Sequence, residues 1–109
     1  MKSTLFLAAS AFGALTLCAG GAQAQALDGA KLYAEKTCVA CHGKGAVKPL
    51  MPDYPKLAGQ NAKYAERQML DIKSGARANG NTAAMKGVMH LVSEAEIKAL
   101  SEYLSKLKP

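Results

Sequence analysis

The sequence predicts an all-α domain of three or four short helices joined by long loops. Two segments, residues 62–74 and 93–107, repeat apolar side chains at intervals of three and four, the spacing of one face of a helix. No run of alternating residues rich in β-branched side chains indicates a strand. The segments 43–59 and 75–82 are rich in glycine, proline or asparagine. Loops of this length are uncommon in a small domain unless something functional orders them.

The predicted domain begins with one short helix and one long loop. The helix covers residues 28–36, because Asp28 can accept hydrogen bonds from the first amides as an N-cap. Leu32 and Tyr33 give this helix an apolar side. Residues 43–59 hold three prolines and three glycines, a density that excludes a long helix or a central strand. We therefore expect an ordered loop there.

The second helix is expected over residues 62–74, with Asn61 as its N-cap. Its buried stripe repeats at i, i+4 and i+7 and consists of Ala65, Met69 and Ile72. Gly75 follows, where a glycine would end the helix. A small and polar loop over residues 75–82 then leads to the segment 83–91, which contains further apolar residues.

The last helix has the clearest sequence pattern. Ser93 and Glu96 have the spacing of a capping box, in which each side chain bonds to the other residue's backbone amide. The apolar face that follows consists of Ile97, Leu100, Leu104 and Leu107. Lys106 and Lys108 suit the negative C-terminal end of the helix dipole.

Residues 1–24 have the pattern of a cleaved secretory signal peptide. A short basic start precedes an apolar run from Leu5 to Ala19, and the small residues of Ala22-Gln23-Ala24 follow. The apolar run is shorter than the roughly 20 residues that span a bilayer, so we expect no stable membrane insertion after cleavage. Cleavage after Ala26 is a near alternative, because Ala24-Gln25-Ala26 also fits.

The expected mature domain, residues 25–109, is too small to rely on an ordinary core. It keeps 13 of the 14 basic residues against 8 acidic residues, and it contains neither Phe nor Trp. One of the three cysteines, Cys18, is lost with the signal peptide. Domains of this size usually need disulfides, a metal or a large cofactor for stability.

The motif that carries chemistry is Cys38-Val39-Ala40-Cys41-His42. C-x-x-C-H is typical of covalent c-type haem attachment, in which two thiols form thioethers with the porphyrin. The next residue, His42, then lies beneath the iron and can bind it through an imidazole nitrogen. The apolar macrocycle would also supply the core that the aromatic residues do not.

Three other interpretations of the cysteine pair fit less well. A structural zinc site needs four protein ligands, and His90 stands at a spacing unlike that of a zinc finger. A thioredoxin-like dithiol needs a βαβ context, which the sequence does not indicate. A disulfide between cysteines three residues apart would close only a very short loop.

The sixth iron ligand is less well determined by the residues alone. Ligation by methionine and histidine is the pattern of electron-transferring c-type haems. The candidates of the mature chain are Met51, Met69, Met85, Met89 and His90. Met85 and Met89 lie where the chain can return over the open haem face, and position favours Met85 only slightly. Ligation by His90 would lower the reduction potential.

The ordered set of motifs resembles the class I c-type cytochromes. It is similar in particular to a single domain of the two-haem periplasmic cytochromes and to their small one-haem relatives. The resemblance covers the whole mature chain and rests on residues 38–43, 55–60, 64, 68–75, 85–87, 93–100 and 103. It implies the cytochrome c fold, with short helices and loops wrapped around one covalently bound haem. It also implies that the first and last helices cross, with Tyr33 near Leu100 and Tyr103.

The resemblance further implies roles for single residues. In the family, the axial methionine precedes the capping serine of the last helix by eight residues, which assigns the role to Met85 and leaves Met89 as packing. A proline carbonyl after the motif accepts the ring N–H of the proximal histidine in the family. Pro52 best matches that position, with Pro55 second.

We expect a soluble periplasmic electron carrier and not an enzyme, because both axial positions of its one haem c iron are filled. Its partners are expected to be redox proteins, and Lys44, Lys48 and Lys86 near the haem edge favour acidic docking surfaces. Nucleic-acid binding is not expected, because the basic residues are scattered. The alternatives are an electron-transfer haem subunit of a larger periplasmic oxidoreductase and, less well supported, a haem enzyme or ligand sensor.

Overall fold

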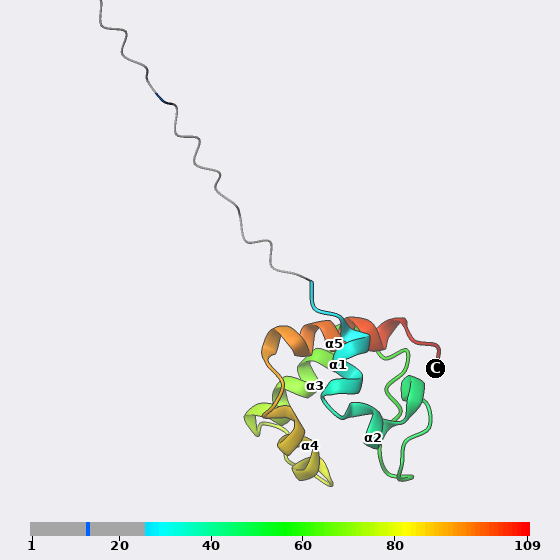
Figure 1. Ribbon diagram of the computed structural model, residues 1–109. Coiled ribbons are helices and arrows are strands. Elements are labelled where there is room, and N and C mark those ends of the chain that lie inside the picture. Colours follow the sequence, from blue (N-terminus) through cyan, green and yellow to red (C-terminus); the bar gives the residue numbers. More distant parts are fainter. Residues whose placement is uncertain (1–12, 14–25) are drawn as a thin grey trace, which may run out of the picture.

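The computed structural model describes residue 13 and residues 26–109 (Figure 1). The predicted signal peptide therefore lies outside the described residues, except for Gly13. The described part is helical and contains no strand, which confirms the predicted all-α class. Its elements, in chain order, are α1 (Gly29–Glu35), α2 (Cys38–His42), the 3-10 turn η1 (Lys44–Ala46), α3 (Ala62–Ser74), α4 (Thr82–Met89) and α5 (Glu94–Lys106). None of these helices is long and apolar enough to cross a membrane.

The described residues form five α-helices, where the sequence predicted three or four. The additional helix is α2, which consists of the five residues of the cysteine motif. A helix of that length is too short to show a periodic apolar pattern. The remaining helices begin and end within one residue of the predicted bounds, except that the segment expected over 83–91 forms a helix over Thr82–Met89.

The predicted caps are present at the starts of three helices. The Asp28 carboxylate accepts hydrogen bonds from the amides of residues 30 and 31, and the Asn61 side chain accepts one from the amide of Tyr64. Ser93 and Glu96 form the reciprocal capping box of α5. Side chains that accept from these first amides satisfy donors that have no partner within the helix. Local sequence therefore determines where these helices start.

Helices α1 and α5 cross in close contact, as expected (Figure 1). A Cβ atom on Gly29 would lie 2.4 Å from the Cβ atom of Tyr103 and 2.6 Å from the carbonyl oxygen of Ala99. Only a glycine allows the two backbones to approach this closely. Beside this contact, the rings of Tyr33 and Tyr103 lie 5.9 Å apart between centroids in a tilted arrangement.

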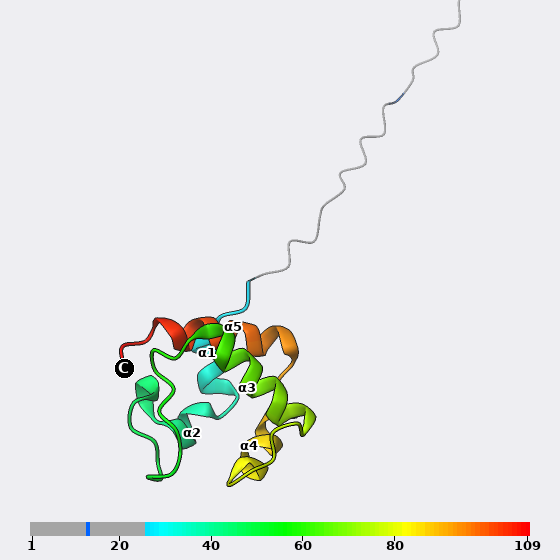
Figure 2. The same ribbon diagram turned by 180° about the vertical axis from the view of Figure 1, so that it is seen from behind.

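The protein core lies where α1 and α3 pack against α5. Ile97, Leu100 and Leu104 contribute the inner face of α5, as its periodicity predicts. The predicted stripe of α3 is also buried. Helix α2 and the loop after it lie on one side of this group, and α4 lies on the other, in both views of the ribbon (Figure 2). Helix α2 with the loop after it forms one wall beside the core, and helix α4 forms a second wall opposite to it.

Candidate functional site

A cavity of about 430 Å³ lies between these two walls. This volume falls within the range of roughly 300–1,000 Å³ that is common for small-molecule and cofactor sites. Helix α2 contributes the cysteine motif to one wall, and α4 contributes Met85 and Val88 to the other. The apolar stripe of α3 lines the cavity between them. Four of the five predicted site residues, Cys38, Cys41, His42 and Met85, therefore line one cavity.

Both thiols of the motif stand on one face of α2. Cys38 and Cys41 are three residues apart, so their side chains are neighbours along the helix. Cys38 is buried and Cys41 is half-buried. Burial raises the pKa of the Cys38 thiol, and the neighbouring Cys41 acts in the same direction. The pair can therefore present two sulfur atoms to one edge of a bound group.

A hydrogen bond fixes the orientation of the His42 imidazole. Its side chain is only 6% exposed, and its Nδ1 atom lies 2.9 Å from the carbonyl oxygen of Pro55. A carbonyl can only accept, so Nδ1 carries the hydrogen in this contact. The Nε2 atom then keeps its lone pair, which is what a metal-ligating histidine needs.

The prediction that Pro52 accepts this hydrogen bond is wrong, and the second candidate, Pro55, makes the contact. Pro52 is exposed and lies inside the turn in which the amide of Tyr54 donates to the carbonyl of Met51. Pro55 is held toward His42 because the amide of Leu57, two residues later, donates to the buried Ala46. A ranking by position along the loop could not include this hydrogen bond, which joins the two ends of the loop.

The chain turns sharply behind the motif at Gly43. Its φ is 82°, and a Cβ atom there would lie 2.0 Å from the carbonyl oxygen of Lys48. The carbonyl of Gly43 accepts a hydrogen bond of 2.6 Å from the hydroxyl of Tyr33. Burial is the main cause that raises the pKa of Tyr33 to about 12. These contacts connect the motif to α1 and to the loop that carries Pro55.

The structure separates the candidates for the sixth ligand. Met85 is half-buried and lines the cavity, as does Met69 from the roof formed by α3. Met89 is fully buried in the core, and Met51 is half-exposed on the loop; neither lines the cavity. His90 is exposed and lines a separate depression beside Arg67 and Glu94.

Polar residues at the rim of the cavity were not predicted from the sequence. Arg77 donates a hydrogen bond of 2.8 Å to the side chain of Gln68, and Asn81 donates one to the carboxylate of Asp53. All four line the cavity. The only sequence signal for them is an arginine and asparagines in a loop next to a predicted cofactor site.

Comparison with known proteins settles the family. The family model for cytochrome c matches residues 26–108. The chain belongs to the cytochrome c family. Proteins of this family carry covalently bound haem c and transfer electrons, and Cys38, Cys41 and His42 fit its attachment motif.

Several bacterial cytochromes are similar to the chain. It is 39% identical to cytochrome c4 of Stutzerimonas stutzeri over 71 residues, and this match covers 64% of the chain and 34% of that protein. It is 41% identical to the thiosulfate dehydrogenase electron acceptor of Thiomonas intermedia over 73 residues, and this match covers 67% of the chain and 32% of that protein. Cytochrome c-553 of Nitratidesulfovibrio vulgaris is 33% identical over 97 residues, covering 85% of the chain and 93% of that protein. The chain spans about a third of the length of the first two relatives.

The residues present fit haem c. The cavity has a thiol pair at one wall, an imidazole with a fixed Nδ1–H, and an apolar roof from α3. Two thiols can form the thioethers, the imidazole nitrogen can bind iron, and the apolar side chains can contact the macrocycle. Haem c also accounts for a domain whose expected mature part has no Phe and no Trp.

Proposed function

We propose that the chain is a periplasmic electron carrier in which His42 and Met85 are the two axial ligands of one haem c. The observation that supports this most strongly is the placement of the two residues. They belong to α2 and α4, which line the same cavity from opposite sides, with the cysteine pair on the α2 wall (Figures 1 and 2).

When bound, haem c supplies one iron that accepts and gives up a single electron. The protein residues determine how that iron is held. The hydrogen bond to Pro55 orients the His42 ring and strengthens its nitrogen as a donor. A methionine ligand raises the reduction potential relative to histidine. With both positions filled by side chains, no position remains for a substrate, which favours a carrier over an enzyme.

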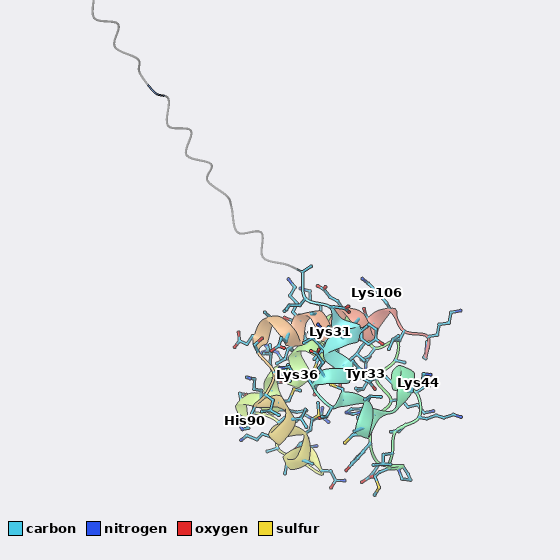
Figure 3. The ribbon with its side chains drawn as sticks, viewed as in Figure 1. Lys31, Tyr33, Lys36, Lys44, His90 and Lys106 are labelled. Carbon is cyan, nitrogen blue, oxygen red and sulfur yellow. The ribbon has the colours of Figure 1, made fainter. Side chains whose placement is uncertain are left out.

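The proposed docking surface for redox partners lies around α2. Val39 is 37% exposed and Leu50 is 70% exposed, and the amide of Leu50 donates to the carbonyl of Cys41. An apolar surface therefore lies beside the thiol that is proposed to bind the haem edge. Lys44 and Lys48 are exposed next to it, and Lys44 lies on the α2 side of the molecule (Figure 3). This combination favours a partner with an apolar centre and an acidic border.

The partner class follows from the relatives. Two of them are named thiosulfate dehydrogenase electron acceptors, which makes an oxidoreductase that releases single electrons the proposed donor. The predicted signal peptide supports a periplasmic location for this exchange. The exposed apolar side chains Val39 and Leu50 beside α2 also favour a second candidate, an electron-transfer subunit whose fixed partner covers them. Co-purification of the native protein separates the two, since a diffusible carrier elutes alone.

The absorption spectrum of the ferric holoprotein tests the ligand set. We expect a methionine–iron charge-transfer band in the wild type and its loss in Met85→Ala. Met51→Leu is the matched control, because Met51 is half-exposed outside the cavity and its replacement should leave the band unchanged. A wild type that lacks the band and readily binds azide in the ferric state, or carbon monoxide after reduction, would show that the carrier assignment is wrong.

A further inference from the structure

The turn between α4 and α5 is held by Lys73 of α3 and by Lys36, the residue that follows α1. Lys73, in the last turn of α3, donates hydrogen bonds from its ammonium to the carbonyls of Met89, at 3.0 Å, and Val92. Lys36 donates to the carbonyl of Leu91 at 2.9 Å. Three of the four carbonyls from residue 89 to residue 92 therefore accept from a positive charge. In Figure 3, Lys36 lies on the α4 side of the molecule, near the turn that contains His90.

The two lysines differ in what else they bind. Lys36 also pairs with Glu96 at 3.3 Å, so its charge is shared with the capping box of α5. None of the ion pairs among the described residues involves Lys73. Among the described residues, the half-buried ammonium of Lys73 therefore bonds to the two carbonyls of the turn and to no carboxylate. A cation at this position also suits the negative C-terminal ends of both α3 and α4.

The two ends of α4 are held very differently. At its C-terminal end, the side chains of Met89 and Val92 are fully buried, and Lys73 binds the carbonyl of each. At its N-terminal end, Asn81 makes no capping hydrogen bond and donates one to the exposed Asp53 across the rim, while Thr82 bonds to the carbonyl of the neighbouring Asn79. Met85 lies between these ends, one helical turn before Met89. The position of its sulfur therefore depends mainly on the C-terminal attachment.

We propose that Lys73 is a positioning residue for Met85, which fastens the C-terminal end of α4 to α3 and so sets how often Met85 withdraws from the cavity. This inference rests on the proposed role of Met85 as a ligand. Without the ammonium, two carbonyls beside fully buried side chains lose a charged donor. Loss of such hydrogen bonds favours states in which the turn opens and α4 moves away.

The test compares Lys73→Met, which keeps the aliphatic chain and removes the donors, with wild-type holoprotein. Imidazole competes with Met85 for the ferric iron, so its apparent affinity reports how often the methionine leaves. We expect that affinity to rise about tenfold, as for the loss of one hydrogen bond to a charged group. Lys73→Arg keeps charge and N–H donors, and it should remain nearer to wild type.

Two control variants distinguish positioning from general destabilisation. Lys63→Met removes an exposed lysine from the same helix and should leave the imidazole affinity unchanged. Ile97→Val removes one methyl group from the fully buried core and lowers stability, while the ammonium of Lys73 and the carbonyls that it binds remain. If Lys73→Met raises imidazole affinity no more than Ile97→Val, at equal loss of global stability, the proposal is overturned.

Amide hydrogen exchange separates failure of this inference from failure of the proposed ligand set. In Lys73→Met, residues 82–89 should exchange faster while the amides of α5 keep their protection. This holds even if the wild type lacks a methionine–iron band, because the lysine would still fasten α4. Unchanged exchange across α4 would overturn the role of Lys73 whatever the sixth ligand is.

Discussion

The two walls of the cavity are built in different ways. On the α2 wall, the hydrogen bonds nearest to His42 join residues of the motif, of the loop that follows it and of α1. His42 and Pro55 are 13 positions apart, and the hydrogen bonds from Leu50 to Cys41 and from Leu57 to Ala46 are similarly short in sequence. On the α4 wall, Met85 is held through a turn that Lys73 and Lys36 bind from 16 to 55 positions away. One wall is assembled locally, and the other depends on the packing of the whole domain.

This difference predicts where each wall fails. Once two thioethers tether haem c to the α2 wall, we expect this wall to move away from the haem only when the whole domain unfolds. A wall that depends on a few long-range hydrogen bonds can open alone, because local openings cost less than global unfolding. Changes on the α2 wall should therefore alter global stability, and changes on the α4 wall should alter ligand exchange at the iron.

The largest effect is expected from Gly43→Ala on the α2 wall. A Cβ atom at 2.0 Å from the Lys48 carbonyl and a φ of 82° force the backbone to move. We expect a loss of about 3 kcal/mol or more in the free energy of unfolding, measured with denaturant on the holoprotein. Gly80→Ala, in the loop before α4, is the matched control. Its φ is also positive at 55°, but nothing lies within 4 Å, so about 1 kcal/mol is expected. Equal losses in both variants would contradict the comparison.

Tyr33→Phe tests the link between α1 and the α2 wall. It removes the 2.6 Å hydrogen bond to the Gly43 carbonyl, at a cost of about 1–2 kcal/mol below pH 10.

The pH dependence of this variant has a definite sign. The pKa of Tyr33 is about 12 in the fold, mainly through burial, against about 10 in an unfolded chain. The unfolded state therefore loses this proton first, and stability is lost as the pH rises from about 10 to 12. Burial persists when Cys38 is a thioether, so the effect should remain in the holoprotein. The difference in unfolding free energy between wild type and Tyr33→Phe should shrink over this range. A difference that stays constant over this range would contradict burial as the cause of the raised pKa of Tyr33. Tyr64→Phe is the control, because Tyr64 is exposed and its replacement should not change the pH dependence of the unfolding free energy in this way.

The smallest effect is expected from Asp53→Ala at the N-terminal end of the α4 wall. Its hydrogen bond to Asn81 joins two exposed side chains across the rim, so its loss should cost about 0.5–1 kcal/mol or less. Imidazole affinity of the ferric holoprotein should change less than about threefold. An effect as large as that of Lys73→Met would mean that α4 is held equally at both ends.

The same division explains what could be predicted from the sequence. The N-terminal ends of three helices, at Asp28, Asn61 and Ser93, could be predicted because capping interactions span only three residues. The cysteine motif could be identified because its signature is complete within five consecutive residues. Helix α2 was not predicted, because five residues show no period.

Contacts between residues more than a few positions apart could not be predicted in this way. The family resemblance favours Pro52 over Pro55, but the hydrogen bond from Leu57 to Ala46 joins the two ends of the loop and so brings Pro55 to His42. Met85 was assigned by family resemblance, and the structure supports that assignment by placing the residue in the cavity wall. The attachment of Lys73 to the turn after α4 has no local signal at all.

The most direct test of the two-walled site is an NMR spectrum of reduced holoprotein labelled with ¹³C at the methionine methyl groups. A methyl group bound through sulfur above the macrocycle is shifted far upfield by the ring current. We predict one such signal, absent in Met85→Leu and retained in Met69→Leu, since both residues line the cavity but only α4 faces α2 across it. A shifted signal that disappears in Met69→Leu, or no shifted signal in the wild type, would contradict the assignment of Met85.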